Sequence, residues 1–254
     1  MADDPFLAAD ESAAVSLIDG APGSPFVLAC DHAGRKVPRR LAGLGLDPDV
    51  LAGHIGWDIG AEPVARLMAE RLGAALVMPA YSRLVIDCNR PVGNPGSIVE
   101  VADGMPVPGN RDLEDRARAA RAEALYRPFH AAIETALDRA AGHAERAIFV
   151  TVHSFTPALA RDGKARPWHV GIIHGEDRRL ADHLIAGLAT DSALVVGDNE
   201  PYSPADNVDH TLARHGAARG IPHAMIEIRN DQLGDRDGQA EWAARLAGIL
   251  ETWR

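Results

Sequence analysis

Two histidines that follow runs of apolar residues have the chemistry of metal ligands. His32 follows the run 26–30, and His153 follows the run 147–152. Catalytic zinc sites combine neutral imidazoles with a further protein ligand such as a carboxylate, and they leave one coordination position open. A single buried histidine is more often hydrogen-bonded to backbone, but two histidines at equivalent strand ends favour a shared site. We therefore expect His32 and His153 to bind one divalent metal ion.

The residues leave the third ligand open. Asp31 precedes His32, but successive side chains of an extended chain point in opposite directions. His54 and Asp58 share one face if their segment is helical. Asp58 also precedes an apolar helical segment, where aspartate is a favoured N-cap residue. Asp31, His54 and Asp58 therefore all remain candidates, and Asp58 has the competing role of a helix cap.

Glu227 lies inside an apolar run that we expect to be a strand. Alternation with a period of two places His223, Met225, Glu227 and Arg229 on one face. A carboxylate buried in a sheet costs free energy unless it is paired or takes part in chemistry. One interpretation is a structural ion pair with Arg229. The other is a general base whose pKa is set by burial and a nearby metal.

Arginines flank the apolar run 84–86. Arg83 precedes this run, and Asn89 and Arg90 follow it. A guanidinium group can bind a carboxylate through two parallel hydrogen bonds, so the segment suits an anionic substrate. In this arginine-rich chain the alternative of ordinary surface arginines is stronger for Arg83 than for Arg90.

The two cysteines, Cys30 and Cys88, both stand in apolar surroundings. Cys88 beside a histidine could act as a thiol nucleophile, although the role of a small core residue is the stronger interpretation. Two such cysteines predict no disulfide framework, and we expect a cytoplasmic protein.

The elements that must position these residues follow from the hydrophobic pattern. Short apolar runs alternate with longer segments of helical period, which is typical of an α/β sheet. The runs expected to be strands are 26–30, 75–78, 84–86, 147–152, 170–173, 193–196 and 224–228. Helices are expected around 64–72, over 112–141 with a kink or break at Pro128, over 177–189 and over 238–252. Because ligands of open α/β sheets bind beyond the carboxyl ends of strands, the polar residues there predict one convergent site.

Composition narrows the class of protein. The 254 residues carry a net charge of -10, which argues against a nucleic-acid-binding surface. No apolar run approaches the roughly 20 residues of a membrane span, and the first residues lack the basic start of a signal peptide. We expect residues 1–24 to be an irregular lead-in and residues 25–254 to form a single domain, with no nucleic-acid or membrane partner.

Six longer blocks of sequence occur in order over about residues 25 to 233. They are Cys30–Gly34, His54–Ala61, Tyr81–Pro91, His153–Pro157, Gly197–Tyr202 and Glu227–Asp231. Together they resemble the N-formylglutamate amidohydrolase family, which is related in fold to zinc carboxypeptidases and succinylglutamate desuccinylases. The resemblance implies a zinc-exopeptidase-like, three-layer α/β/α fold with a mixed, mainly parallel central sheet.

The same resemblance implies a Zn²⁺-dependent hydrolase that cleaves a small anionic N-acyl amino acid such as N-formylglutamate. His32, Asp58 and His153 would hold the metal, and Glu227 would be the base that activates a water molecule. Together with the residues already discussed, it leads us to expect substrate contacts from six residues, namely Arg83, Asn89, Arg90, Asp198, Tyr202 and Arg229.

One position departs from the related carboxypeptidases, which carry a glutamate three residues after the first histidine. Arg35 occupies that position here. The departure motivates the alternative of a catalytically idle metal- or anion-binding protein on the same scaffold. A thiol hydrolase using Cys88 is the other alternative.

Overall fold

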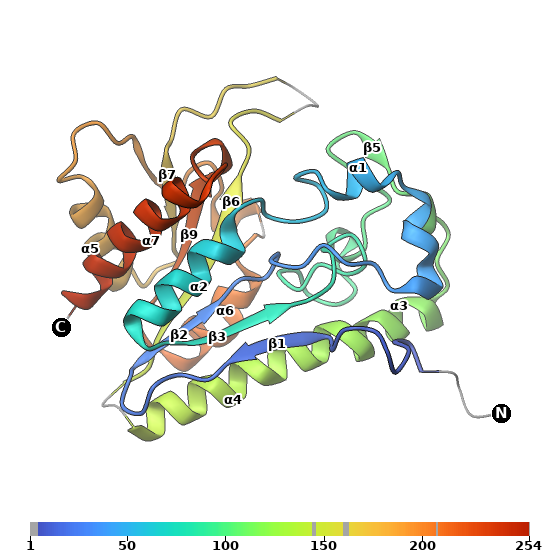
Figure 1. Cartoon of the computed structure of the whole chain (residues 1–254), viewed down its shortest axis with the longest axis horizontal. Coiled ribbons are helices and arrows are strands. Elements are labelled where there is room, and N and C mark those ends of the chain that lie inside the picture. Colours follow the sequence, from blue (N-terminus) through green and yellow to red (C-terminus); the bar gives the residue numbers. More distant parts are fainter. Residues whose placement is uncertain (1–4, 144–145, 160–162, 207, 254) are drawn as a thin grey trace.

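The protein is built on one seven-stranded sheet, seen in a computed structural model that describes residues 5–143, 146–159, 163–206 and 208–253 (Figure 1). The strand order is β1-β3-β2-β6-β9-β7-β8. The strands are β1 (Val15–Ile18), β2 (Phe26–Ala29), β3 (Ala75–Pro79), β6 (Ile148–Phe155), β7 (Val170–Ile173), β8 (Val196–Asp198) and β9 (His223–Arg229). Strands β3, β2, β6 and β9 run parallel, whereas β1 is antiparallel to β3 and β7 is antiparallel to β9. The sheet is therefore mixed and mainly parallel, as expected.

Helices cover both faces of this sheet. One layer consists of α2 (Ala61–Leu72), α5 (Arg179–Leu188) and α7 (Arg236–Glu251). The opposite layer consists of α4 (Arg127–His143) and α6 (His210–His215), and Figure 1 shows α2 and α4 on opposite sides of the strands. The expected three-layer α/β/α architecture is confirmed.

Alternation along the central strands separates the two cores. Val150 and Ile226 face the layer of α2, α5 and α7, whereas Phe149 and Met225 face the layer of α4 and α6. Strands covered on both faces are apolar at nearly every position, which is why the runs in β6 and β9 were visible in the sequence. The polar exceptions in these strands therefore identify the functional site.

Two segments differ from the expected pattern at the N-terminal edge of the sheet and after β3. Residues 15–18, expected to lie in an irregular lead-in, form edge strand β1 against β3. Four residues are too few to show a period, so pairing with the free edge of β3 decides their conformation. Residues 84–86 are buried but form a turn rather than a strand, and they pack with Leu44 and Leu125 in a third apolar cluster. An apolar run indicates that its residues are buried but does not show that they form a strand. Residues 84–86 are buried in the third apolar cluster, outside the sheet.

The other expected strands agree in place with the structure, with one shift. Only Val196 of the run 193–196 lies in β8, which continues to Asp198. The remaining short elements are α1 (Pro48–Leu51), α3 (Asp115–Arg121) and the hairpin of β4 (Val101–Ala102) and β5 (Met105–Pro106).

The long helical segment over 112–141 is interrupted near Pro128, as its sequence predicts. Helix α3 runs into a π-helical turn over residues 122–126, and α4 begins at Arg127. Proline lacks a backbone N–H, and its ring collides with the preceding turn of a regular helix. A π-helical turn before the proline relieves this conflict and places Pro128 in the first turn of α4.

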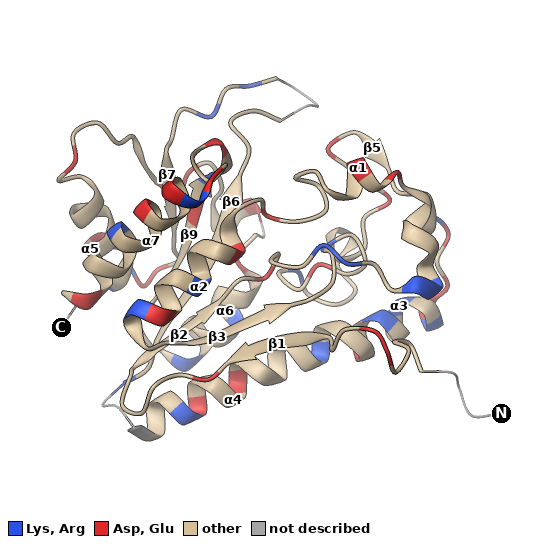
Figure 2. Ribbon diagram, viewed as in Figure 1, with Lys and Arg blue, Asp and Glu red and all other residues tan. Residues whose placement is uncertain are grey.

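No helix among the described residues is long and apolar enough to cross a membrane. Acidic and basic side chains are interspersed along α2, α3 and α4 in the view of Figure 2.

Candidate metal centre

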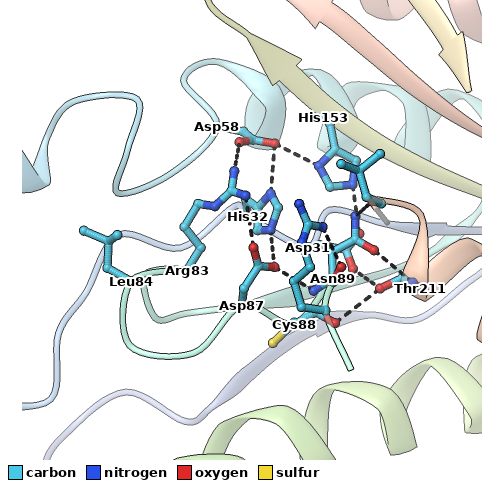
Figure 3. A network of polar contacts seen from close by, with 12 residues as sticks. Asp31, His32, Asp58, Arg83, Leu84, Asp87, Cys88, Asn89, His153 and Thr211 are labelled. Carbon is cyan, nitrogen blue, oxygen red and sulfur yellow. Dashed lines mark hydrogen bonds and ion pairs between the residues drawn. The ribbon is translucent and has the colours of Figure 1, made fainter. Parts of the chain in front are cut away.

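Three separate elements bring the candidate ligands together. His32 follows β2, Asp58 precedes α2, and His153 lies near the end of β6. Nδ1 of His153 lies 2.9 Å from Oδ2 of Asp58, and Nδ1 of His32 lies 3.3 Å from the same oxygen. One ligand atom from each residue lies within 4.8 Å of the others, and all three side chains are buried (Figure 3). No other three His, Cys, Asp or Glu side chains converge in this way within the described ranges.

The turn before α2 fixes the position of Asp58. Its backbone N–H donates to the carbonyl of His32 at 3.0 Å. Gly60 adopts a left-handed φ of 81°, and a Cβ atom there would lie only 2.4 Å from Cβ of Leu233. Gly60 itself is the N-cap residue of α2, so the alternative role of Asp58 as a helix cap is wrong. Its carboxylate is available to the two histidines.

The other two candidates for the third ligand lie elsewhere. Asp31 Oδ2 lies 3.0 Å from Nε2 of His153, on the opposite side of that ring from Asp58. Nε2 of His54 lies 2.9 Å from Asp103. The structure therefore brings Asp58, rather than Asp31 or His54, to the two Nδ1 atoms.

Opposite charges dominate the electrostatics of this cluster. Burial alone would raise the pKa of Asp58, but His32 and His153 outweigh it and lower this pKa far below its ordinary value. Burial alone would lower the pKa of His153, but hydrogen bonds with Asp31 and Asp58 raise it. The site thus stabilises an ionised carboxylate beside two imidazoles, which is an environment that suits a cation.

Glu227 stands next to His153 because β6 and β9 pair these residues directly. Its side chain is buried, and its Oε2 atom has no hydrogen-bond partner among the described residues. Burial raises the pKa of Glu227 to about 7. Arg229 donates instead to Asp231 at 2.9 Å and to the carbonyls of Arg166 and Pro167. The alternative of a structural Glu227–Arg229 ion pair is therefore wrong.

A cavity of about 80 Å³ joins the candidate metal ligands to Glu227. Four of the expected substrate-binding residues also line this cavity, namely Arg83, Asn89, Arg90 and Tyr202. A neighbouring cavity of about 290 Å³ shares Arg90 and Tyr202 with it. The two cavities together offer space for a small substrate beside Glu227.

Arg90 and Tyr202 differ in how they are held. Arg90 donates to the carbonyl of Asn89 at 2.8 Å, and no carboxylate forms an ion pair with its guanidinium in the described part of the chain. The hydroxyl of Tyr202 accepts a hydrogen bond from Arg166 at 3.1 Å, and the Arg166 guanidinium lies 4.9 Å from the ring centroid. The amide of Asn89 is used by the backbone of Val208 and Thr211. Arg90 is thus the cation best placed for an anionic ligand.

The remaining expected substrate contacts are engaged in protein contacts. Arg83 also lines both cavities, but its guanidinium lies 3.0 Å from Asp87 and 3.4 Å from Asp58. Asp198 pairs with Arg178 at 2.8 Å and with His174 at 2.7 Å. Asp198 and Arg229 line neither cavity.

Two residues of the cluster were not assigned roles from the sequence. Asp87 Oδ1 lies 2.7 Å from Nε2 of His32, and the hydroxyl of Thr211 donates to Asp31. The position of Asp87 directly after the buried run 84–86 was the available signal. Thr211 lies in the first turn of the short helix α6, far away in the sequence, and no local pattern marked it.

Arg35 and the cysteines lie apart from this arrangement. The guanidinium of Arg35 lies 5.2 Å from the ring centroid of Trp57, and the carboxylate that lies beside His32 and His153 is that of Asp58. Cys30 and Cys88 are buried, and burial raises the pKa of both thiols well above the ordinary value. A buried, protonated thiol is a poor nucleophile, which argues against thiol chemistry.

Comparisons with known proteins identify the family and the fold. Residues 24–233 match the sequence model of N-formylglutamate amidohydrolase. The gene product Atu2144 from Agrobacterium tumefaciens is 40% identical, with a TM-score of 0.91 over 97% of this chain and 98% of that chain. N-formylglutamate amidohydrolase from Ralstonia eutropha JMP134 is 19% identical, with a TM-score of 0.69 over 94% of this chain and 96% of that chain, and shares the fold. No curated protein matches the chain. Because the matched segment covers most of its length, the chain belongs to the N-formylglutamate amidohydrolase family.

Proposed function

We propose that this protein is a metal-dependent amidohydrolase that cleaves the amide bond of a small N-acyl amino acid, with N-formylglutamate as the representative substrate. The observation that carries the proposal is the convergence of His32, Asp58 and His153 beside the unpartnered Oε2 of Glu227 in one cavity. Family membership supports the reaction class. The three donors supply the metal site, and Glu227 supplies the base.

The donor chemistry fits a divalent cation. Two imidazoles and a carboxylate are a ligand set of catalytic zinc sites. Four buried carboxylates lie in or around the cluster, while two guanidiniums, those of Arg83 and Arg90, line the cavity. The carboxylates are those of Asp31, Asp58, Asp87 and Glu227. A dication held by His32, Asp58 and His153 would offset the excess negative charge, and Zn²⁺ is the ion that we propose.

A divalent ion at these ligands would supply Lewis-acid catalysis, because it polarises a carbonyl group and lowers the pKa of water. Glu227 accepts a proton from the water molecule that attacks the amide carbonyl carbon. The same carboxyl group then donates this proton to the leaving nitrogen as the C–N bond breaks. Burial raises its pKa to about 7 in the metal-free protein, and a nearby dication would lower this value, so the group can accept and then release a proton near neutral pH.

Arg90 is the residue that we propose to bind the carboxylate of the substrate. Its guanidinium faces both cavities and has no ion pair with a carboxylate of the described chain. Tyr202 forms a wall shared by the two cavities, and its position is fixed by Arg166. The side-chain amide of Asn89 is hydrogen-bonded to the backbone of Val208 and Thr211, and it thereby fixes their segment beside the site. The larger cavity would receive the part of the substrate that lies away from the scissile bond.

The test combines metal analysis with amide hydrolysis. Purified protein is assayed on N-formylglutamate and a panel of N-acyl amino acids before and after treatment with a chelator, and then after addition of Zn²⁺. We expect chelation to abolish hydrolysis and Zn²⁺ to restore it. Glu227→Gln should lower kcat/KM by about 10²- to 10⁴-fold while the bound metal is retained.

Each possible result decides between the candidate functions. Full activity of Glu227→Gln would rule out the proposed base. Bound metal without turnover of any substrate in the panel would instead support the idle metal-binding protein. Activity that survives chelation would exclude metal dependence.

A further inference from the structure

A separate buried carboxylate contacts the Nε2 atom of each candidate ligand histidine. Nε2 of His32 lies 2.7 Å from Asp87 Oδ1, and Nε2 of His153 lies 3.0 Å from Asp31 Oδ2. Figure 3 shows the two carboxylates on the sides of the rings that face away from Asp58. Because the Nε2 atoms are engaged in this way, the Nδ1 atoms of both rings are the ones directed at Asp58.

The two carboxylates differ in their remaining partners. The other oxygen of Asp87 lies 3.0 Å from Arg83, and its Oδ1 also accepts from the backbone N–H of Asn89 at 2.8 Å. The charge of Asp87 is therefore shared with a guanidinium. The other oxygen of Asp31 accepts from the neutral hydroxyl of Thr211. In the described part of the chain, no arginine or lysine forms an ion pair with Asp31.

The orientation of Asp31 is fixed by α6. Thr211, in the first turn of α6, is fully buried, and its backbone N–H donates to Oδ1 of Asn89 at 2.9 Å. Its hydroxyl group is thus locked in place while it donates to Asp31. The side chain of Asp31 is itself 0% exposed, so water does not weaken its interaction with His153.

We propose that Asp31 and Asp87 are positioning residues for metal binding, which fix both histidines for ligation through Nδ1, and that Asp31 contributes more than Asp87. The proposal rests on the proposed function. A carboxylate that accepts the Nε2–H of an imidazole fixes its tautomer and ring orientation and strengthens it as a ligand. No cation among the described residues offsets the negative charge of Asp31 at His153, whereas the guanidinium of Arg83 partly offsets the negative charge of Asp87 at His32.

The test measures zinc affinity of the full chain by competition with a coloured chelator. We expect Asp31→Asn to weaken zinc binding by about 10- to 100-fold, and Asp87→Asn to weaken it by a smaller factor. Asp103→Asn is the matched control, because the side chain of Asp103 is only 7% exposed and pairs with a histidine, His54, that is not among the ligands. This control should bind zinc as tightly as the wild type.

A second pair of variants and a spectroscopic readout separate positioning from a structural role. Thr211→Val removes the donor to Asp31 and should weaken zinc binding, whereas Thr211→Ser keeps the hydroxyl and should restore it. Long-range ¹H–¹⁵N spectra of the zinc-loaded wild type should show both rings protonated at Nε2. Circular dichroism of the metal-free proteins establishes that each variant is folded.

The outcomes are distinct from a failure of the proposed function, which would be seen in the wild type, either as no zinc binding or as bound zinc without hydrolysis of any substrate in the panel. Unchanged affinity in Asp31→Asn, or an equal loss in Asp103→Asn, overturns the positioning role. A loss in Asp87→Asn that matches that in Asp31→Asn overturns the ranking. Protonation at Nδ1 in the loaded wild type overturns the proposed mode of ligation.

Discussion

His153 and Glu227 are direct partners in the parallel pairing of β6 with β9. Side chains of directly paired residues in adjacent strands project from the same face of a sheet, so the imidazole and the carboxylate stand side by side. Two strands distant in sequence thereby place a candidate metal ligand next to a candidate base. The rest of the site is assembled around this pair from the segments that carry His32, Asp58 and Arg90.

On the acidic side of the pH–rate profile, the fall of kcat/KM should follow the protonation of the Glu227 carboxylate. Its pKa is about 7 in the metal-free protein, and a nearby dication would favour the carboxylate and lower this value. Since the base acts when it is unprotonated, kcat/KM should fall by about tenfold per pH unit below a pKa that lies under about 7. The measurement is kcat/KM for N-formylglutamate between about pH 5 and about pH 9. A rise of kcat/KM on acidification would contradict the assignment.

Replacement of Glu227 should stabilise the metal-free protein at neutral and alkaline pH. Burial raises the pKa of Glu227 from 4.5 to about 7, so the folded state binds more protons than the unfolded state between these values. The wild type therefore loses stability as the pH rises through this window. Glu227→Gln avoids the loss, and its free energy of unfolding at about pH 8 should exceed that of the wild type by about 1 to 3 kcal/mol.

Urea unfolding of chelator-treated proteins measures this difference. The advantage of Glu227→Gln should vanish below about pH 4.5, where the wild-type carboxyl is protonated in both states. A constant difference across the pH range would show that the effect is one of packing and not of ionisation.

Loss of Arg90 should weaken substrate binding. Charge-assisted hydrogen bonds contribute about 1.5 to 3 kcal/mol, so Arg90→Met should raise KM by about 10- to 100-fold with a smaller change in kcat. Arg178→Met is the control, because Arg178 is an exposed arginine paired with Asp198 and Asp182, and it lines neither cavity. Steady-state kinetics on N-formylglutamate test this, and an unchanged KM in Arg90→Met would assign the carboxylate to another residue.

Loss of Arg83 should destabilise the fold more than loss of an exposed arginine. Arg83 bridges the buried carboxylates of Asp58 and Asp87, and removal of one partner leaves buried charges without compensation. We expect Arg83→Met to lower the free energy of unfolding of the metal-free protein by about 1 to 3 kcal/mol. Arg66→Met breaks only the exposed pair with Glu62 and should change stability by less than about 1 kcal/mol. Equal effects in urea unfolding would mean that the bridge is weak.

Removal of the Cys88 thiol should leave catalysis intact. Cys88 is buried, and burial holds the pKa of its thiol well above the ordinary value. Cys88→Ala should therefore keep kcat/KM within about twofold of the wild type, with a stability loss of about 1 kcal/mol for the vacated volume. Inactivation by this substitution, with the protein still folded, would revive the thiol mechanism.

The sequence determined the parts of the site that depend on local pattern. His32 and His153 follow apolar runs, and Glu227 is a charged residue inside another apolar run. The sequence therefore predicted that all three residues lie on strands of the sheet or at their ends. Burial and a period of two are properties of a few consecutive residues, which is why they are visible without the fold. The six longer blocks resemble the N-formylglutamate amidohydrolase family, and this resemblance added an expected fold and reaction to the predicted site.

The tertiary structure decided what depends on distant segments. The residues alone left Asp58, Asp31 and His54 as candidates, and the family resemblance favoured Asp58. In the folded chain, Asp58 lies at both Nδ1 atoms, whereas Asp31 lies at Nε2 of His153. Arg83 was expected to contact substrate, but it is held between two carboxylates that only the folded chain places there. The sequence does not show which carboxylate an arginine will pair with, because the energy of an ion pair depends on the distance between the two charges. Only the folded chain sets these distances.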